Sequence, residues 1–224
     1  MNGGTAAALA LWTSIVPRAQ LDHIVVAIRN LDEGIAQFEQ LTGVTAGAGG
    51  KHPGRGTENA LVSLDGGAYL EIIAPQASAA LSPRDEAMRA LDRLTIIDWA
   101  VSVPELDRAV AALKSVGFDS LPAQPGARLT PAGERLDWTT FALNGAGIDA
   151  APFFIRWSPN TRHPSTTAPG GCCLDRLVVQ DPTSDRLERV LQALAIAGVT
   201  IASGERRIEA MLSCGDTRVT LTSL

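Results

Sequence analysis

Three similar segments constrain the fold of this chain more than any other feature of its sequence. Each segment opens with a strand-like apolar run, continues with apolar residues at helical spacing, and reaches a glycine that can end the helix. The interval from strand to glycine hardly changes: 20 residues from His23 to Gly43, 19 from Asp98 to Gly117 and 22 from Arg176 to Gly198. Two or three further strand-like runs follow each glycine, so we interpret each segment as a βαβββ module.

The predicted helix starts carry specific capping signals. Asn30 precedes the first helix, and Glu33 stands at the third helical position, as in a capping box. In the third copy, we expect Asp181 to cap the helix and Pro182 to be its first residue. The glycine-rich run GAGG at 47–50 is interpreted as a hairpin turn.

These modules predict the organisation of the whole chain. It divides into an N-terminal extension (1–19), a first βαβββ module (20–76), a linker helix (77–95), a second module (96–158), a loop (159–172) and a third, degenerate module (173–224). One module alone leaves a sheet face uncovered, so modules are expected to pair. The predicted fold class is α+β, in which paired modules form a curved, cup-shaped mixed sheet. The unpaired third module predicts a homodimer, because a second copy would cover its sheet.

Composition and charge narrow the class of partner. Hydrophobic residues make up 46% of the 224 residues and charged residues 19%, as in a globular protein. A net charge of -5 provides no basic surface for nucleic acid or an anionic membrane, so a small-molecule ligand is expected. The apolar run near the N-terminus lacks a preceding Lys or Arg, which favours a cytoplasmic location over secretion. Cys172, Cys173 and Cys214 are accordingly expected to be reduced, unreactive thiols.

The first module carries a candidate metal site. Alternation along LDHIVVAI places His23, Val25 and Ala27 on one face, and Glu71 in AYLEIIAP can share that face from a neighbouring strand. Asp98 would supply a third ligand, a set suited to Zn²⁺, Mn²⁺, Fe²⁺ or Ni²⁺. Alternatively, His23 is a core residue hydrogen-bonded to Glu71, and Asp98 caps a turn or pairs with Arg156.

The segment KHPGRGTENALVSL is a candidate substrate site. His52, Arg55, Thr57 and Asn59 place an imidazole, a cation and two hydrogen-bonding groups at the rim of the cup, where they can bind a carboxylate or carbonyl. His52 or Glu71 would transfer a proton. The alternative is turn chemistry, in which Thr57 and Asn59 satisfy nearby amides.

Three residues of the later segments complete the predicted binding site. Trp99 is a candidate for an aromatic wall, although large aromatic residues on strands are more often core. Arg156 would favour an anion over a cation if it enters the cup. His163 either covers the cup as part of a lid or lies in a solvated loop.

The ordered string LDHIVVAI, KHPGRGTENALVSL, YLEIIAP, FFIRW and RHPSTTAPGGC resembles the vicinal oxygen chelate superfamily, and most of all its glyoxalase-like domain branch. That superfamily includes glyoxalase I, extradiol dioxygenases and bleomycin-resistance proteins. The resemblance implies that His23 and Glu71 bind a divalent metal together with a second pair from the partner module. There the chain departs from the pattern, with Asp98 in the histidine place and Ile155 or Arg156 in the glutamate place. Branch members often carry GTHN where this chain has Glu58 in GTEN.

Three functional interpretations remain. The first is a metal-dependent lyase, isomerase or dioxygenase of unassigned substrate. The second is a metal-free protein that binds a small molecule, as resistance proteins do. The third is a structural or interaction subunit, which only the degenerate third module favours. Superfamily membership does not choose among them, because one fold supports several chemistries.

Overall fold

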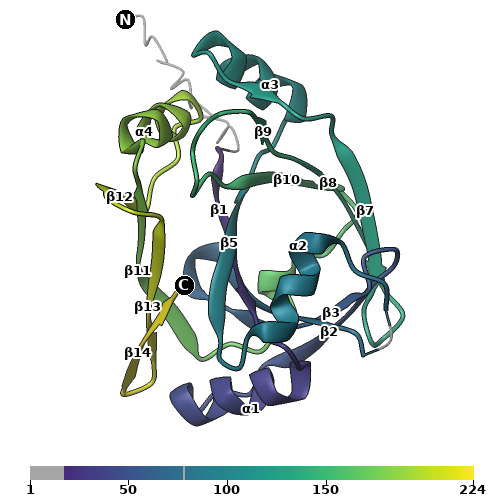
Figure 1. Ribbon diagram of the computed structural model, residues 1–224. Coiled ribbons are helices and arrows are strands. Elements are labelled where there is room, and N and C mark those ends of the chain that lie inside the picture. The colour runs from purple at the N-terminus through teal and green to yellow at the C-terminus, as the bar shows by residue number, and fades with distance from the viewer. Residues whose placement is uncertain (1–17, 78) are drawn as a thin grey trace, which may run out of the picture.

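The computed structural model describes residues 18–77 and 79–224, so most of the predicted N-terminal extension lies outside the described residues. Two larger sheets, a two-stranded sheet and three longer helices make up the described part (Figure 1). The first module contains β1 (Gln20–Ala27), α1 (Leu31–Thr42), β2 (Gly47–His52), β3 (Thr57–Ser63) and β4 (Tyr69–Pro75). A short helical linker follows, with α2 (Pro83–Glu86) and a 3-10 turn η2 (Ala87–Ala90).

The second and third modules repeat this order. The second contains β5 (Thr95–Ser102), α3 (Leu106–Ser115), β6 (Asp119–Ser120), β7 (Gln124–Leu129), β8 (Arg135–Phe141), β9 (Leu143–Asn144) and β10 (Phe153–Trp157). The third contains β11 (Cys172–Asp181), α4 (Ser184–Ala193), β12 (Val199–Ser203), β13 (Arg207–Cys214) and β14 (Thr217–Thr222). Two 3-10 turns, η1 (Asp65–Gly67) and η3 (Pro164–Thr166), lie in connecting segments.

The first two modules join their sheets into one curved sheet of eight strands. Its order is β2-β3-β4-β1-β5-β10-β8-β7, with β1 antiparallel to β5 at the centre and parallel to β4. The outer strands β2 and β7 approach each other, and Arg128 on β7 donates a hydrogen bond to the carbonyl oxygen of Gly49 on β2. The predicted cup of paired βαβββ modules is therefore confirmed.

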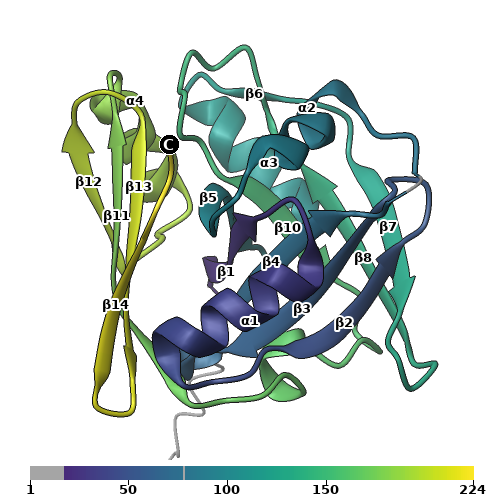
Figure 2. The same ribbon diagram turned by 60° about the horizontal axis from the view of Figure 1, so that its bottom comes forward.

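The C-terminal module forms a separate four-stranded sheet that covers part of the outside of the cup. Figure 2 shows α1 running along the outside of the larger sheet, with the smaller sheet beside it. The apolar faces of both sheets share one core, which includes Ile24 on β1, Trp99 on β5, Leu177 on β11 and Leu212 on β13. The chain thus covers the apolar face of its own third module, which removes the reason given above for a homodimer. The dimer itself stays a prediction.

The helix termini largely follow the capping signals. The Asn30 side chain accepts a hydrogen bond of 3.0 Å from the Glu33 amide, and Gly43 ends α1 at a φ of 73°. At α4 the structure corrects the predicted start, because the helix begins at Ser184 and its N-cap is Thr183. Asp181 belongs to β11, where its buried carboxylate accepts the amides of Ala150 and Thr183.

The run at 47–50 is not a hairpin turn but the start of edge strand β2. Its glycines permit close approach, since a side chain on Gly49 would overlap the amide of Asn59. A side chain on Gly50, whose φ is 140°, would overlap the carbonyl of Leu129 on β7. Glycine here therefore lets β2 pack against neighbouring groups rather than reverse the chain.

The cysteine prediction also needs correction. Cys172 and Cys214 lie opposite each other on β11 and β13 and form a disulfide, with Cα atoms 4.1 Å apart. Cys173 remains a free thiol and donates to the Asp65 carboxylate. Disulfides persist mainly in oxidising compartments, so the cysteines no longer support the prediction of a reducing one. Within residues 18–77 and 79–224, no helix is long and apolar enough to cross a membrane.

Candidate functional site

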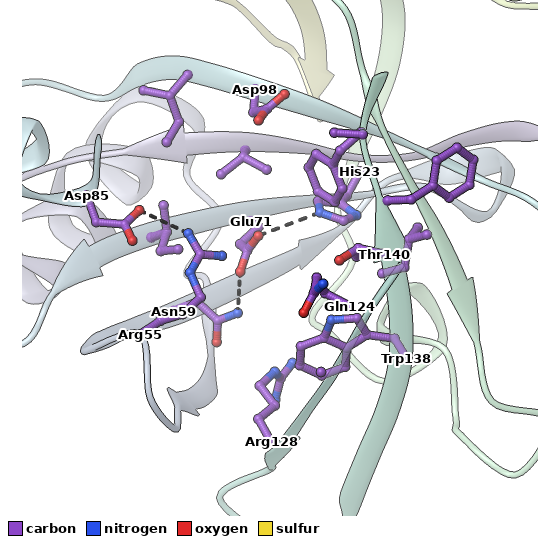
Figure 3. Close-up of a pocket in the computed structure, with 18 of the residues that line it drawn as sticks. His23, Arg55, Asn59, Glu71, Asp85, Asp98, Gln124, Arg128, Trp138 and Thr140 are labelled. Atoms are coloured by element: carbon purple, nitrogen blue, oxygen red, sulfur yellow. Dashed lines mark hydrogen bonds and ion pairs between the residues drawn. The ribbon is translucent and has the colours of Figure 1, made fainter. Parts of the chain in front are cut away.

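A cavity of about 390 Å³ opens on the concave face of the eight-stranded sheet (Figure 3). His23, Asn59 and Glu71 line it from the first module, whereas Trp138 and Trp157 line it from the second. Its volume falls in the range of cavities that bind small molecules. The concave face is therefore the candidate site, as the sequence predicted.

Strand alternation on β1 explains why the charged groups face the cavity. His23 and Val25 line it, whereas Ile24 and Val26 point into the apolar core on the other side of the sheet. Val25 is paired with Glu71 on β4, which places that glutamate close to His23. The distance from His23 Nε2 to Glu71 Oε2 is 3.7 Å.

Asp22 lies behind His23 and was missed by the sequence analysis. Simple alternation would put neighbouring residues on opposite faces, but a register shift between Leu21 and His23 brings both side chains together. Asp22 Oδ1 is 2.6 Å from His23 Nδ1, and Asp22 Oδ2 accepts a bond of 3.0 Å from the Trp157 indole. A carboxylate can only accept, so His23 donates from Nδ1 and directs Nε2 toward Glu71.

Glu71 is fixed by a second set of contacts from β2 and β3. The Asn59 amide donates to Glu71 Oε1 at 2.6 Å, and His52 Nε2 lies 3.6 Å from the same oxygen. His52 is also hydrogen-bonded through Nδ1 to the Thr57 hydroxyl at 2.9 Å. His52 and Thr57 are buried behind Glu71 and do not line the cavity. They are therefore placed to position Glu71 rather than to contact a ligand.

The charges in this cluster shift the pKa values in opposite directions. Burial is the largest single influence on His23 and opposes its charge, but the bond to Asp22 and the nearby carboxylates together raise its pKa. Burial also opposes ionisation of Glu71, yet His52, His23 and the Asn59 amide together lower its pKa. Burial lowers the pKa of His52. The cluster thus favours a carboxylate at Glu71 and an imidazolium at His23.

The positions in the second module that are equivalent to His23 and Glu71 hold other residues. The first strands of the two modules, β1 and β5, run antiparallel at the centre of the sheet, where Ile24 pairs with Trp99. Counting one residue back along each strand from this pair makes Asp98 the counterpart of His23. Counting one residue forward makes Ala100 the counterpart of Val25. Ala100 is paired with Phe153, so Phe153 occupies the place of Glu71. This register corrects the sequence alignment, which offered Ile155 or Arg156.

Asp98 faces the cavity, whereas Arg156 points away from it. Asp98 lines the cavity, and its Oδ1 also accepts the Trp99 amide at 2.9 Å. Arg156 does not line the cavity, and its Nε donates to the Pro104 carbonyl oxygen at 3.2 Å. Alternation on β10 accounts for this, since Phe153, Ile155 and Trp157 face the cavity.

Two other predicted contact residues lie elsewhere. Trp99 is completely buried in the core, where its indole donates to the Ala150 carbonyl oxygen at 2.9 Å. His163 lies beside the cavity wall, with Nε2 3.1 Å from Asp22 Oδ2 and its ring against Tyr69 and Trp157. Among the loop residues, Arg55 lines the cavity but is paired with Asp85 at 2.9 Å.

Arg128 and Tyr69 are cavity residues that the sequence analysis did not identify. Arg128 is 4% exposed and extends from β7, a strand that no apolar pattern predicted. Tyr69 stacks on His23 with ring centroids 4.6 Å apart, and burial raises its pKa well above the usual value. Once β7 is recognised as a strand, alternation places Arg128 on the same face as Gln124 and Gly126, which also line the cavity together with Pro125.

The donor set is small for a metal. Within the described ranges 18–77 and 79–224, no three His, Cys, Asp or Glu side chains lie close enough together to bind one ion. A catalytic zinc commonly has about three protein ligands. His23 and Glu71 lie 3.7 Å apart on the cavity wall, and Asp98 lines the same cavity without joining them in such a group.

Comparisons with known proteins place this architecture in a family. The model of a family described as "Glyoxalase-like domain" matches residues 21–195. A hypothetical protein from Staphylococcus aureus is 14% identical, with a TM-score of 0.62 over 92% of this chain and 85% of the other, which supports the fold. No curated protein gives a significant match.

Two epimerases are more distant in structure. Methylmalonyl-CoA epimerase from Mycobacterium tuberculosis is 24% identical with a TM-score of 0.44, over 67% of this chain and 95% of the other. A variant of the Streptomyces coelicolor methylmalonyl-CoA epimerase, in complex with 2-nitronate-propionyl-CoA, is 16% identical with a TM-score of 0.46, over 62% of this chain and 98% of the other. The family match covers most of the sequence and agrees with the cup of paired modules, so the chain belongs to the glyoxalase-like domain family.

Proposed function

We propose that the protein binds a small carbonyl compound in the cavity and that Glu71 and His23 transfer a proton on it, as in a lyase or isomerase. One observation carries this proposal: Glu71 Oε2 and His23 Nε2 face each other on the cavity wall at 3.7 Å. That separation is too long for a hydrogen bond between them. Both atoms are therefore available to a ligand.

The two groups are suited to opposite roles. The lowered pKa of Glu71 keeps it ionised, so it can accept a proton from the carbon next to a carbonyl. The raised pKa of His23 favours the imidazolium, which can donate to the carbonyl oxygen and stabilise the enol that forms. A carboxylate of low pKa is a weak base, so the substrate carbon must itself be acidified by the carbonyl.

The contacts behind these groups support the same roles. Asp22 fixes the His23 ring through Nδ1, and Asn59 fixes the Glu71 carboxylate through Oε1. Such fixed geometry is what proton transfer requires, because a reacting group held in place needs little reorganisation. The opposite wall, with Trp138, Trp157 and Phe153, suits an apolar part of the ligand.

Hydrogen–deuterium exchange tests the proposal without a known substrate. A panel of 2-oxo acids, 3-oxo acids and thioesters would be incubated with the protein in D₂O, and loss of the signal of the carbon-bound hydrogen followed by proton NMR. We expect exchange of at least one compound, which Glu71→Gln abolishes. Glu58→Gln is the matched control, since Glu58 lies on the other face of β3 from Asn59 and does not line the cavity. Exchange that is absent for the whole panel, or that persists in Glu71→Gln, would refute the proposal.

A divalent metal at His23 and Glu71 is the second candidate. The 3.7 Å between Nε2 and Oε2 is within the span of one ion bonded to both at about 2.0–2.2 Å. The ligand or water would have to complete the coordination. Elemental analysis of protein purified without chelator or histidine tag tests this, together with His23→Ala and Glu71→Ala. Substoichiometric metal that neither substitution changes would exclude a metal site there.

A further inference from the structure

Arg128 is a buried cation on the cavity wall whose contacts do not account for its charge. It is 4% exposed, and its Nη1 donates to the carbonyl oxygen of Gly49. Within residues 18–77 and 79–224, its guanidinium makes no other hydrogen bond and no ion pair within 4.0 Å. A guanidinium has five N–H donors, so most of them are available to a ligand.

The cation is directed into the same space as the proposed reacting groups. Figure 3 shows its guanidinium pointing into the cavity that Glu71, Gln124 and Trp138 also line. Burial lowers the pKa of Arg128, while the charge of the Glu71 carboxylate on the same cavity wall opposes that shift. Glu71 does not neutralise Arg128, because its oxygens face Asn59, His23 and His52.

The other cavity arginine is in a different situation. Arg55 is paired with Asp85 at 2.9 Å, and its side chain is 55% exposed. Water and a carboxylate therefore already compensate its charge. Arg128 has no carboxylate within 4.0 Å in the described part of the chain, and a largely buried cation without an opposite charge is unfavourable unless a partner binds.

We propose that Arg128 binds the carboxylate of the cavity's ligand, so that the substrate class is a small monocarboxylate that also carries a carbonyl group. The inference rests on the proposed function, because it concerns the same cavity. Arginine binds carboxylates through two parallel N–H donors, which fixes the orientation of the bound acid. A single guanidinium balances a single negative charge, which favours a monocarboxylate over a doubly charged phosphate.

Calorimetric titration with 4-methyl-2-oxopentanoate and with its neutral amide tests the inference. We expect the acid to bind the wild-type protein about tenfold more tightly than the amide. Arg128→Gln should abolish that preference, because it removes the cation and should weaken binding of the acid much more than binding of the amide. Arg135→Gln removes a 66% exposed arginine from β8 and is the matched control. Arg128→Lys keeps the charge and should retain part of the preference, even if the glutamine variant does not fold.

The outcomes separate this inference from the proposed function. Equal affinity of the wild-type protein for acid and amide would overturn the role of Arg128 but keep the cavity as a carbonyl site. An acid preference that survives in Arg128→Gln would overturn it as well, and would leave Arg128 with only the contact between β7 and β2. Failure of both compounds to bind at millimolar concentration would overturn this substrate class, while the exchange panel independently decides the proton transfer. Displacement of the acid by equimolar inorganic phosphate would assign the site to phosphate instead.

Discussion

Asp22→Asn tests how strongly the buried carboxylate behind His23 contributes to the fold. Asp22 is 1% exposed and accepts from His23, His163 and Trp157. Burial, the largest single influence, raises its pKa, but the bonds from His163 and His23 and their charges outweigh it and lower the pKa from 3.8 to about 2. Asparagine keeps the shape of the side chain and removes the charge.

The size and the pH dependence of the effect follow from this pKa. One pKa unit corresponds to about 1.4 kcal/mol, so ionised Asp22 contributes about 2.5 kcal/mol to the free energy of unfolding at neutral pH. A carboxyl group whose pKa is lower in the folded state stabilises above its unfolded pKa, here 3.8, and loses that effect as the pH falls toward the folded pKa of about 2. The difference between wild type and variant should therefore shrink to about 1.3 kcal/mol at pH 3.

Urea denaturation at pH 7 and at pH 3, followed by tryptophan fluorescence, measures both values. Asp92→Asn is the matched control, because Asp92 is exposed and its side chain makes no hydrogen bond or ion pair in the described part of the chain. Its unfolding free energy should equal that of the wild type at either pH. An Asp22→Asn variant as stable as wild type at pH 7, or one equally destabilised at pH 7 and pH 3, would refute the electrostatic reasoning.

Four further results are expected. Gly49→Ala should lower the free energy of unfolding by about 1–3 kcal/mol in thermal melts, because the added methyl group would crowd the Asn59 amide, and it should reduce the deuterium exchange followed by NMR. Gly170→Ala has open space around it and should change neither quantity. Cys214→Ser opens a disulfide loop spanning 42 residues and should cost about 4 kcal/mol in melts under air, a difference that dithiothreitol removes. Phe153→Glu restores a carboxylate opposite Glu71 and should raise zinc content to about one ion per chain by elemental analysis; unchanged content would contradict the register argument. Light scattering tests the homodimer predicted from the sequence, for which the packing of the third module no longer gives a reason; a mass of 23.5 kDa at micromolar concentration, that of one chain, would reject it.

The repeated modules were predictable because each carries its own local signals. A capping asparagine at residue 30, a left-handed glycine at residue 43 and apolar runs such as YLEIIAP determine structure over a few residues. Two of the strands that escaped prediction, β2 and β7, read GAGGKH and QPGARL and have little apolar pattern. They exist because neighbouring strands pair with them, which is a tertiary effect.

The same limit explains which site residues were missed. Asp22 joins His23 only through a register shift between two strands, and strand alternation alone assigns it to the other face. Arg128 lies on the unpredicted strand β7. Cys172 and Cys214 meet because β11 and β13 pair, and no spacing rule links them. His23 and Glu71 were predictable because alternation applies without interruption from His23 to Val25, the residue that pairs with Glu71.

The two modules carry different residues at equivalent positions, so the two sides of the cavity differ chemically. His23 and Glu71 have Asp98 and Phe153 as their counterparts, so the pair that we propose transfers a proton occurs on one side only. On the other side Phe153 adds an apolar wall, and Arg128 adds a cation that no module symmetry requires. A ligand with a carbonyl, a negative charge and an apolar part can satisfy all three regions in only one orientation. This asymmetry favours a site that distinguishes one ligand orientation over a symmetric cage of four metal ligands.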